Sequence, residues 1–311
     1  MTSSTGGRGQ GRGKVILFGE HAVVHGRPAI ACALDRGATA RVSKARDIPL
    51  RISHPQGVIE DSPQLRRALD ALFAVFGADA AQWSIEIDIA IPVGVGLGSS
   101  AAMAVAVARA LADALNLQGP EAARRIEQAA SASESAIHGT PSGIDQRAAM
   151  GDDFFSFARR PDDDPAVAPI EAEPSTWVIA SVAPPSSTAD MVHAVSSRHD
   201  EQPHLCEQIF DTIADISQRS VDALQRGDRQ AIGQLMDLNQ GLLNALGTST
   251  PALETACHLA REAGALGAKL TGAGGGGCII ALAPKSGAGP IADALSSMGR
   301  PLIVTLPSGQ E

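Results

Sequence analysis

The sequence contains no tyrosine and few other aromatic residues, with 7 phenylalanines and 2 tryptophans among 311 residues. Aromatic side chains normally bury a large area in a core, so the core here must consist mainly of Ala, Val, Leu and Ile. Cysteine is also scarce, and its four positions (32, 206, 257 and 278) include no CxxC pair. We therefore expect reduced, mostly buried thiols in a cytoplasmic protein.

Long apolar runs and excess positive charge are missing as well. Charged residues interrupt every apolar stretch before about 18 residues, so no membrane span is expected. The start, MTSSTGGRGQGRG, has two arginines but no apolar segment. It is therefore no secretory signal, and residues 1–13 are predicted to form a flexible tail. The net charge of −9 argues against nucleic acid or an anionic membrane as a partner.

The chain is long for a single core, and its composition is that of a globular protein, 44% hydrophobic and 19% charged. A change of composition near Pro174 suggests a boundary between two domains, residues 14–174 and 175–311. No internal repeat is visible.

Periodicity predicts an α+β (α/β) fold. In the first domain, strands are expected at 15–18, 28–34, 38–42, 50–53, 83–91 and 154–157, and helices at 63–76, 100–115 and 120–138. In the second domain, strands are expected at 177–182, 268–270, 278–282 and 302–306, and helices at 189–199, 203–225, 228–246, 251–263 and 290–298. The Asp/Pro-rich segment RRPDDDP is expected to be a solvated loop.

The stretch IPVGVGLGSSAAM, residues 91–103, joins a predicted strand to a predicted helix through three alternating glycines. Glycine leaves no side chain between peptide N–H groups and an anion, and a helix N-terminus attracts negative charge. The stretch therefore predicts a phosphate-binding loop. It lacks the GK[ST] of the common nucleotide-binding loop, and it also lacks the GxGxxG spacing of dinucleotide-binding loops. The alternative is an ordinary turn before an Ala-rich core helix.

Two further motifs contain candidate chemical groups. GKVILFGEHAVVHG (residues 13–26) places Lys14, Glu20 and His21 at the ends of a buried strand. ESAIHGTPSGIDQ (residues 134–146) contains Glu134 and Asp145, and one carboxylate can accept a hydroxyl proton while the other holds Mg²⁺. The alternatives are a solvated lysine, a polar turn, and a helix-capping aspartate.

A fourth motif, KLTGAGGGGCIIAL (residues 269–282), has five glycines among residues 272–277. Such backbone must approach something closely, either a phosphate or the other glycine loop. We expect the other glycine loop, because Lys269 is the only cation nearby and lies at a supporting strand position.

These four motifs, in this order and over nearly the whole chain, resemble those of the GHMP small-molecule kinases. Within that superfamily, GEHAVVHGRPAIA, HGTPSGIDQ and KLTGAGGGGC are most similar to the mevalonate kinases. The resemblance implies a ribosomal-protein-S5-like N-terminal domain and a ferredoxin-like C-terminal domain. It also implies an ATP-dependent kinase that uses Mg²⁺ to phosphorylate the primary hydroxyl of mevalonate, in isoprenoid precursor synthesis.

Matched position by position, the resemblance implies a role for each motif residue. Asp145 would be the general base, and Lys14 would neutralise developing charge. Ser100 and Glu134 would hold Mg²⁺, and Glu20, His21 and Thr188 would lie at the acceptor. The ATP phosphates would be bound by Gly94, Gly96, Leu97, Gly98, Ser99, Ser100 and Ala101. Gly272, Gly274, Gly275 and Gly276 would form a supporting loop.

One position departs from the family pattern. The residue after the family threonine is usually Lys or Arg, whereas Thr188 is followed here by Ala189. Two alternatives therefore stay open: a GHMP kinase acting on a related hydroxy acid or sugar, and a non-catalytic ligand-binding member. Retention of Lys14, Ser100, Glu134 and Asp145 argues against the second. A monomer and a homodimer are both compatible with the sequence.

Overall fold

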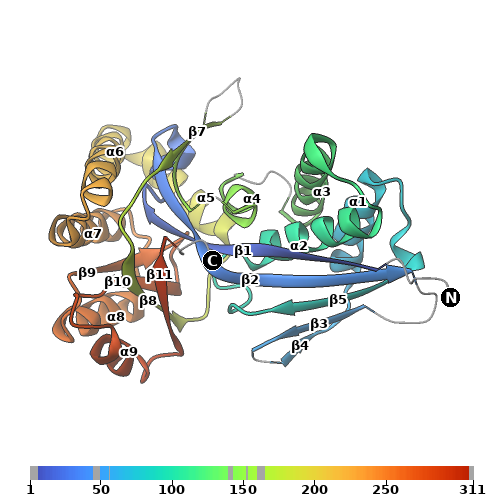
Figure 1. The fold of residues 1–311 in the computed structure, drawn as a ribbon. Helices are drawn as coiled ribbons and strands as arrows, with labels where there is room; N and C mark the ends of the chain where they lie inside the picture. Colours follow the sequence, from blue (N-terminus) through green and yellow to red (C-terminus); the bar gives the residue numbers. More distant parts are fainter. Residues whose placement is uncertain are drawn as a thin grey trace. The chain divides into compact units, whose positions relative to one another are not determined.

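The computed structural model describes residues 6–44, 50–55, 57–138, 143–151, 153–159 and 165–307. The chain forms two compact units, drawn in Figure 1. Unit 1 comprises Met1–Lys14 and Arg36–Gly151, and unit 2 comprises Val15–Asp35 and Asp152–Glu311. This division differs from the predicted boundary at residue 174, because the strands β1 (Gly6–Phe18) and β2 (Ala29–Lys44) each contribute residues to both units.

Unit 1 combines a mixed sheet with helices. Its strand order is β4 (Gly57–Ile59), β3 (Arg51–His54), β5 (Trp83–Ile89) and β2, with β1 paired to β2. Strand β3 runs parallel to β5, and the β3–β4 and β2–β5 pairs are antiparallel. Figure 1 shows helices on one side of this sheet. They are α1 (Pro63–Val75), α2 (Ser99–Ala114) and α3 (Gly119–His138), and the short elements are η2 (Ala80–Gln82) and α4 (Ile144–Ala149).

Local sequence explains why α1 begins where it does. Ser62 is the N-cap, and its side chain accepts a hydrogen bond from the Leu65 amide, while Pro63 occupies the first turn. Both features favour a helix start, since they satisfy or remove amides that lack a helical partner. The buried face consists of Leu65, Ala68, Leu69, Leu72 and Phe73 at helical spacing.

Residues 6–13, predicted to be part of a flexible tail, instead form the first part of β1. The reason lies in Gly7, Gly9 and Gly11. A Cβ atom added to these residues would lie 2.0, 2.2 and 2.1 Å from the carbonyl oxygens of Ala110, Ala106 and Ala102. Two strand residues advance about 6.6 Å and four helix residues about 6 Å, so alternate glycines match successive turns of α2. The glycines are therefore packing positions against a helix.

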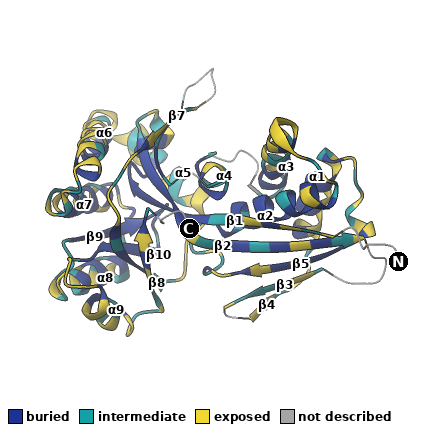
Figure 2. Cartoon of the chain, viewed as in Figure 1, coloured by how far each residue is buried: buried dark blue, intermediate teal, exposed yellow. Residues whose placement is uncertain are grey.

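Helix α2 is buried along almost its whole length, as its mainly dark blue ribbon in Figure 2 shows. Its buried residues are mostly alanine and valine, whose small side chains allow neighbouring backbones to approach closely. The sheet, α1 and α3 thus enclose α2, whose first residues directly follow the glycine loop.

Unit 2 contains two antiparallel groups of strands. The first pairs β2 with β6 (Phe154–Ala158), and β6 with β7 (Ala166–Ile170). The second has the order β11 (Pro301–Leu306), β8 (Ser175–Ala183), β10 (Gly277–Leu282) and β9 (Gly267–Thr271). The helical elements are η1 (Ala22–His25), α5 (Thr188–Glu201), α6 (Pro203–Gln225), α7 (Arg229–Ala245), α8 (Pro251–Glu262) and α9 (Gly289–Leu295).

Most predicted elements are confirmed. The strand candidates 28–34 and 38–42 form the single strand β2, and strands β4 and β7 and the short helices η1 and η2 were not predicted. Strand β7 is short and contains Pro169, so its sequence resembles that of a loop. Most of the predicted RRPDDDP loop lies outside the described residues.

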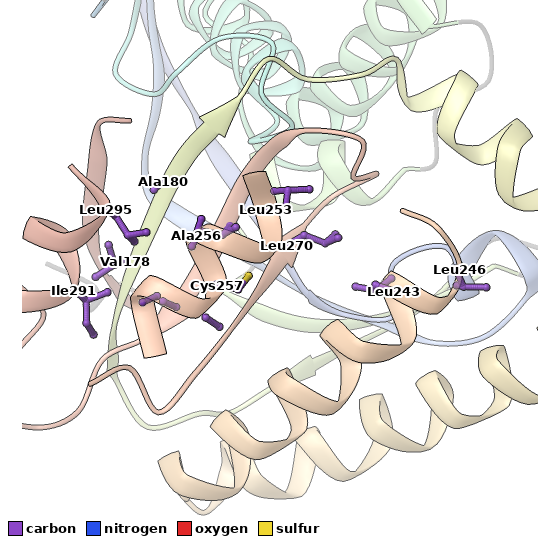
Figure 3. Packing of buried hydrophobic residues seen from close by; sticks show 14 of the residues in the cluster. Val178, Ala180, Leu243, Leu246, Leu253, Ala256, Cys257, Leu270, Ile291 and Leu295 are labelled. Carbon is purple, nitrogen blue, oxygen red and sulfur yellow. The ribbon is translucent and has the colours of Figure 1, made fainter. Parts of the chain in front are cut away.

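The core of unit 2 is aliphatic, as the scarcity of aromatic residues predicts. Figure 3 shows Val178, Leu253, Leu270 and Leu295 among the residues that strands and helices contribute to it. Cys257 lies in the same core, where burial raises the pKa of its thiol to about 12. All four cysteines are buried, as expected. Among the described residues, no helix is long and apolar enough to span a membrane.

Candidate active site

The loop after β5 presents open backbone. Gly94, Gly96 and Gly98 have φ angles of +76°, +86° and +73°, which side-chain-bearing residues rarely adopt. A Cβ atom added to Gly94 or Gly96 would meet nothing within 4 Å. Leu97 is buried, and its carbonyl accepts a hydrogen bond from the Lys14 amide at 2.9 Å. The loop is thus anchored at Leu97 and unobstructed at Gly94 and Gly96.

The first turn of α2 has no side-chain cap, because its N-cap residue is Gly98. The first amides of a helix need partners and form its positive end, so an anion can take the place that a capping side chain has elsewhere. Ser99 is buried, and the Ser100 hydroxyl donates a hydrogen bond to the carboxylate of Glu134 on α3. Glu134 is only 4% exposed.

Lys14 and Asp145 form an ion pair, with the Lys14 Nζ atom 3.1 Å from Asp145 Oδ1. The lysine side chain is 6% exposed and the aspartate side chain 41%, so the carboxylate stays accessible. A Cβ atom added to Gly98 would lie 2.9 Å from Lys14 Cγ, so glycine there leaves room for the lysine. Asp145 is the second residue of α4, whose N-cap is Gly143. The alternative prediction that Asp145 caps this helix is therefore wrong.

Two arginines hold the end of α4, and sequence reasoning missed both. Arg109 donates to the carbonyls of Met150 (2.6 Å) and Gln10 (2.8 Å). Arg12 donates to the Gly151 carbonyl at 3.3 Å. Burial lowers the pKa of the Arg109 guanidinium. A single arginine in the Ala- and Val-rich helix α2 is the sequence feature that could have indicated this role.

Glu20 and His21 lie in unit 2, immediately after β1. Glu20 is 2% exposed, and its carboxylate forms an ion pair with Lys269. This arrangement gives Glu20 a structural partner inside the unit rather than a carboxylate open to a ligand. The His21 Nε2 atom lies 2.8 Å from the Ala273 carbonyl, within the glycine loop 272–277.

That glycine loop packs against other segments of its own unit. A Cβ atom at Gly274 would lie 2.2 Å from the Thr248 carbonyl oxygen, and one at Gly276 would lie 2.0 Å from that of Pro184. The Gly275 amide donates to the Thr248 carbonyl at 2.7 Å. The nearest atoms to these added Cβ atoms thus belong to residues 248 and 184 of the same unit. Gly272 has nothing within 4 Å of an added Cβ.

Thr188 is exposed at the start of α5, whose N-cap is Ser187. The preceding Ser186 donates to the Gly275 carbonyl at 2.9 Å, and a Cβ atom at Gly275 would lie 2.5 Å from the Met191 sulfur. The segment that carries Thr188 therefore contacts the glycine loop.

The predicted site residues thus form two groups. Unit 1 contains Lys14, residues 94–101, Glu134 and Asp145, and unit 2 contains Glu20, His21, Thr188 and the second glycine loop. Residues 139–142, the predicted turn before Asp145, lie outside the described residues.

Family models match both halves of the chain. Residues 64–152 match the family described as GHMP kinases N terminal domain, and residues 220–301 match GHMP kinases C terminal. The chain belongs to the GHMP kinases, and it has the predicted two-domain fold of that family.

Individual relatives point to one group within this family, the mevalonate kinases. The mevalonate kinase of Methanothermobacter thermautotrophicus is 37% identical over 304 residues, which cover 92% of each chain. That of Pyrococcus horikoshii is 34% identical over 295 residues, 87% of each chain. Among solved structures, the L. major mevalonate kinase in complex with R-mevalonate has a TM-score of 0.86 at 28% identity, covering 98% of this chain and 97% of that one. A Lactococcus lactis galactokinase at 19% identity has a TM-score of 0.73, with 98% and 94% of the two chains covered, and shows the fold alone.

Proposed function

We propose that this protein transfers the γ-phosphoryl group of ATP to the primary hydroxyl of mevalonate. The observation that carries the proposal is the Lys14–Asp145 ion pair at 3.1 Å, in the same unit as a helix N-terminus without a side-chain cap. The curated relatives at 34–37% identity are mevalonate kinases, which supports mevalonate as the acceptor.

Asp145 is the general base of the proposed reaction. The acceptor oxygen attacks the γ-phosphorus, the bond from that phosphorus to the ADP oxygen breaks, and the hydroxyl proton passes to Asp145. A partly exposed carboxylate suits this task, because it can meet a substrate. Lys14 offsets the negative charge that develops on the transferring group.

The backbone amides of residues 94–101 bind the ATP phosphates. The open positions at Gly94 and Gly96 and the uncapped start of α2 support this assignment. Since the net charge is −9, the protein holds polyphosphate with local donors rather than a general positive field.

Magnesium fits the oxygen donors of unit 1. The Ser100 hydroxyl and the Glu134 carboxylate adjoin each other, and Mg²⁺ commonly takes one or two protein oxygens together with substrate phosphates. No group of three or more His, Cys, Asp or Glu that could hold a metal occurs in the part of the chain that the structure describes. Ser100 and Glu134 would hold the ion, which would neutralise phosphate charge when bound.

One observation favours a related acceptor. Ala189, in the first turn of α5, cannot supply the positive charge that Lys or Arg provides at this position in the family pattern. The substrate carboxylate would then have to be recognised by other groups, or the acceptor would be another hydroxy acid.

An assay of ADP release over several acceptors decides between these possibilities. We expect kcat/KM for mevalonate to exceed that for galactose, homoserine and phosphomevalonate by about tenfold or more, equivalent to about 1.4 kcal/mol of transition-state binding. A comparable or higher value for one competitor would exclude mevalonate as the preferred acceptor. The cytoplasmic location stays a prediction, as does the choice between monomer and homodimer.

A further inference from the structure

His21 occupies a backbone conformation that is unfavourable for a residue with a side chain. Its φ and ψ angles are +60° and −46°. The Ala22 amide donates to the Glu20 carbonyl at 2.7 Å, which closes a γ-turn around His21. A γ-turn with positive φ at its central residue is rare and strained. Such a conformation persists only where the surroundings determine it, and it is most frequent at functional sites.

Three alternate residues at the end of β9 and the start of the glycine loop hold this turn and the strand before it. Lys269 donates to the Glu20 carboxylate. The Thr271 hydroxyl donates to the Ile16 carbonyl at 2.9 Å and accepts from the Ile16 amide at 3.1 Å. The Ala273 carbonyl binds the His21 ring. Alternation along a strand places the Lys269 and Thr271 side chains on one face of β9, and the Ala273 carbonyl follows them in the loop.

The contact between Lys269 and Glu20 is the most deeply buried of the three. The two side chains are 0% and 1% exposed. Lys269 also donates to the Leu270 carbonyl at 2.6 Å, and Asn239 on α7 donates to Glu20 at 3.4 Å. Burial lowers the pKa of the Lys269 ammonium, and the Glu20 carboxylate opposes that effect.

Stability alone does not account for a buried ion pair. Desolvation of two charges offsets most of their attraction, so apolar side chains of similar volume often stabilise a protein equally well. What the pair supplies here is a fixed position for Glu20, because Lys269 and Asn239 both donate hydrogen bonds to its carboxylate and Lys269 also donates to the Leu270 carbonyl. Glu20 directly precedes the strained position.

The orientation of the His21 ring follows from the same contacts. A carbonyl oxygen can only accept, so the Nε2 atom that faces Ala273 carries the hydrogen. Burial lowers the pKa of His21, which favours the neutral ring. In the neutral ring Nδ1 then carries the lone pair, and its direction is set by the turn.

We propose that Lys269 and Glu20 are positioning residues, whose buried ion pair holds the strained His21 turn and the base of the glycine loop 272–277 for catalysis. This inference rests on the proposed function, since it takes His21 to lie at the acceptor, as the family resemblance implies. Neither Lys269 nor Glu20 needs to touch a substrate.

A double-mutant cycle separates positioning from stability. The variants are Lys269→Met, Glu20→Gln and the double variant. We expect each single change to lower Tm, because it leaves one charge buried without its partner, and the double variant to recover most of the loss. Despite this recovery, kcat/KM for mevalonate should stay about tenfold or more below that of the unmodified protein, with KM for ATP within about twofold.

The matched control is the double variant Asp237→Asn, Arg261→Gln. This ion pair also contacts β9, since Asp237 accepts from the Ala268 amide at 3.0 Å and Arg261 donates to the Ala268 carbonyl at 2.6 Å. Within the described part of the chain, neither of these two side chains hydrogen-bonds to residues 20–22. We expect kcat/KM in this control to fall only as far as the loss of folded protein indicated by its lower Tm.

Nitrogen-15 NMR of the histidine rings gives a second readout that does not require turnover. The ring of His21 should show the Nε2–H form in the unmodified protein, and its nitrogen shifts should move in the Lys269→Met, Glu20→Gln double variant. If either kcat/KM or the His21 shifts stay unchanged in that variant, the positioning role is excluded. If the unmodified protein does not phosphorylate mevalonate, the proposed function fails, whereas the His21 shifts still decide the role of the pair.

Discussion

At the scale of single residues, the two carboxylates of unit 1 differ in environment. Asp145 has a side chain that is 41% exposed and a lysine ammonium 3.1 Å away. Glu134 is 4% exposed and accepts a hydrogen bond from the Ser100 hydroxyl. An accessible carboxylate can receive a proton from a substrate, whereas a buried one beside a hydroxyl suits a metal ion that stays in place. The structure thus supports the role of proton acceptor proposed for Asp145 and the role of metal ligand proposed for Glu134.

The change Asp145→Asn should abolish proton acceptance while preserving shape. Removal of a general base typically costs about 10²- to 10⁴-fold in rate, or roughly 3 to 5.5 kcal/mol of barrier. We therefore expect kcat to fall on that scale, with nucleotide affinity and Tm almost unchanged. Steady-state kinetics measure kcat and nucleotide affinity, and thermal melts measure Tm. The control is Asp70→Asn, on the exposed face of α1. Near-normal turnover would mean that the base is another group.

The change Glu134→Gln tests the proposed magnesium ligand. The amide retains a hydrogen-bond acceptor for Ser100 but loses the negative charge that attracts Mg²⁺. Turnover should fall and the half-saturating Mg²⁺ concentration should rise by about tenfold, while the melting temperature stays close to that of the unmodified protein. An unchanged Mg²⁺ titration in a folded variant would remove Glu134 from this role.

At the scale of elements, the contact of β1 with α2 determines what the N-terminal residues do. Glycine and arginine are common in flexible tails, so residues 6–13 carry no local indication of a strand. Their alternate glycines match the four-residue spacing of Ala102, Ala106 and Ala110 only because β1 lies against α2. By contrast, α1 and α8 could be placed from sequence, since Ser62–Pro63 and Thr250–Pro251 are local helix-start patterns.

A side chain at Gly9 should therefore destabilise unit 1. The Cβ atom of Gly9→Val would lie 2.2 Å from the Ala106 oxygen and 2.4 Å from the Ala110 nitrogen, so the backbone would have to move. We expect a loss of about 3 kcal/mol or more. Gly241→Ala is the control, because nothing lies within 4 Å of its added Cβ on α7, and it should stabilise by about 0.5–1 kcal/mol. Equal melting temperatures for Gly9→Val and the unmodified protein would contradict the contact.

At the scale of the whole molecule, histidines in unit 2 link folding stability to pH. The His25 ring stacks on Phe210 at 4.2 Å and lies 5.2 Å from the His199 ring. Burial chiefly, then His199 and Arg27, lower the pKa of His25, while Glu207 on α6 opposes them. Burial also lowers the pKa of His21. Both histidines therefore bind protons more weakly when the protein is folded.

Stability should consequently fall as the pH decreases below the ordinary histidine pKa of 6.5, because the unfolded chain takes up protons first. The loss ends once the pH passes the lowered pKa of the folded state, and one histidine contributes at most about 1.4 kcal/mol per pH unit. The midpoints of urea unfolding at pH 7.5 and at pH 5.5 measure this loss of stability. His25→Gln should reduce the difference between the two midpoints, whereas His258→Gln, at an exposed position on α8, should retain it. Identical differences for both variants would contradict the role of His25.

The sequence by itself determined the features that depend on neighbours along the chain. Alternation predicted β5, helical spacing predicted α1, and the order of four motifs indicated the family. Glycines 94, 96 and 98 adopt the positive φ angles that a phosphate loop requires. These inferences succeed because strand alternation, helix periodicity and capping act over a few residues.

Only the tertiary structure decided which distant groups meet. Lys269 pairs with Glu20 across 249 positions, and Arg109 reaches the carbonyls of residues 10 and 150. A lysine in the motif KLTG and a glutamate in GEH carry no local sign of each other, and both could equally face solvent. Their meeting depends on the path of β1 beside β9, which satisfies two buried charges at once. This path gave Glu20 a partner inside the protein, and the packing of β1 against α2 turned a predicted tail into a strand.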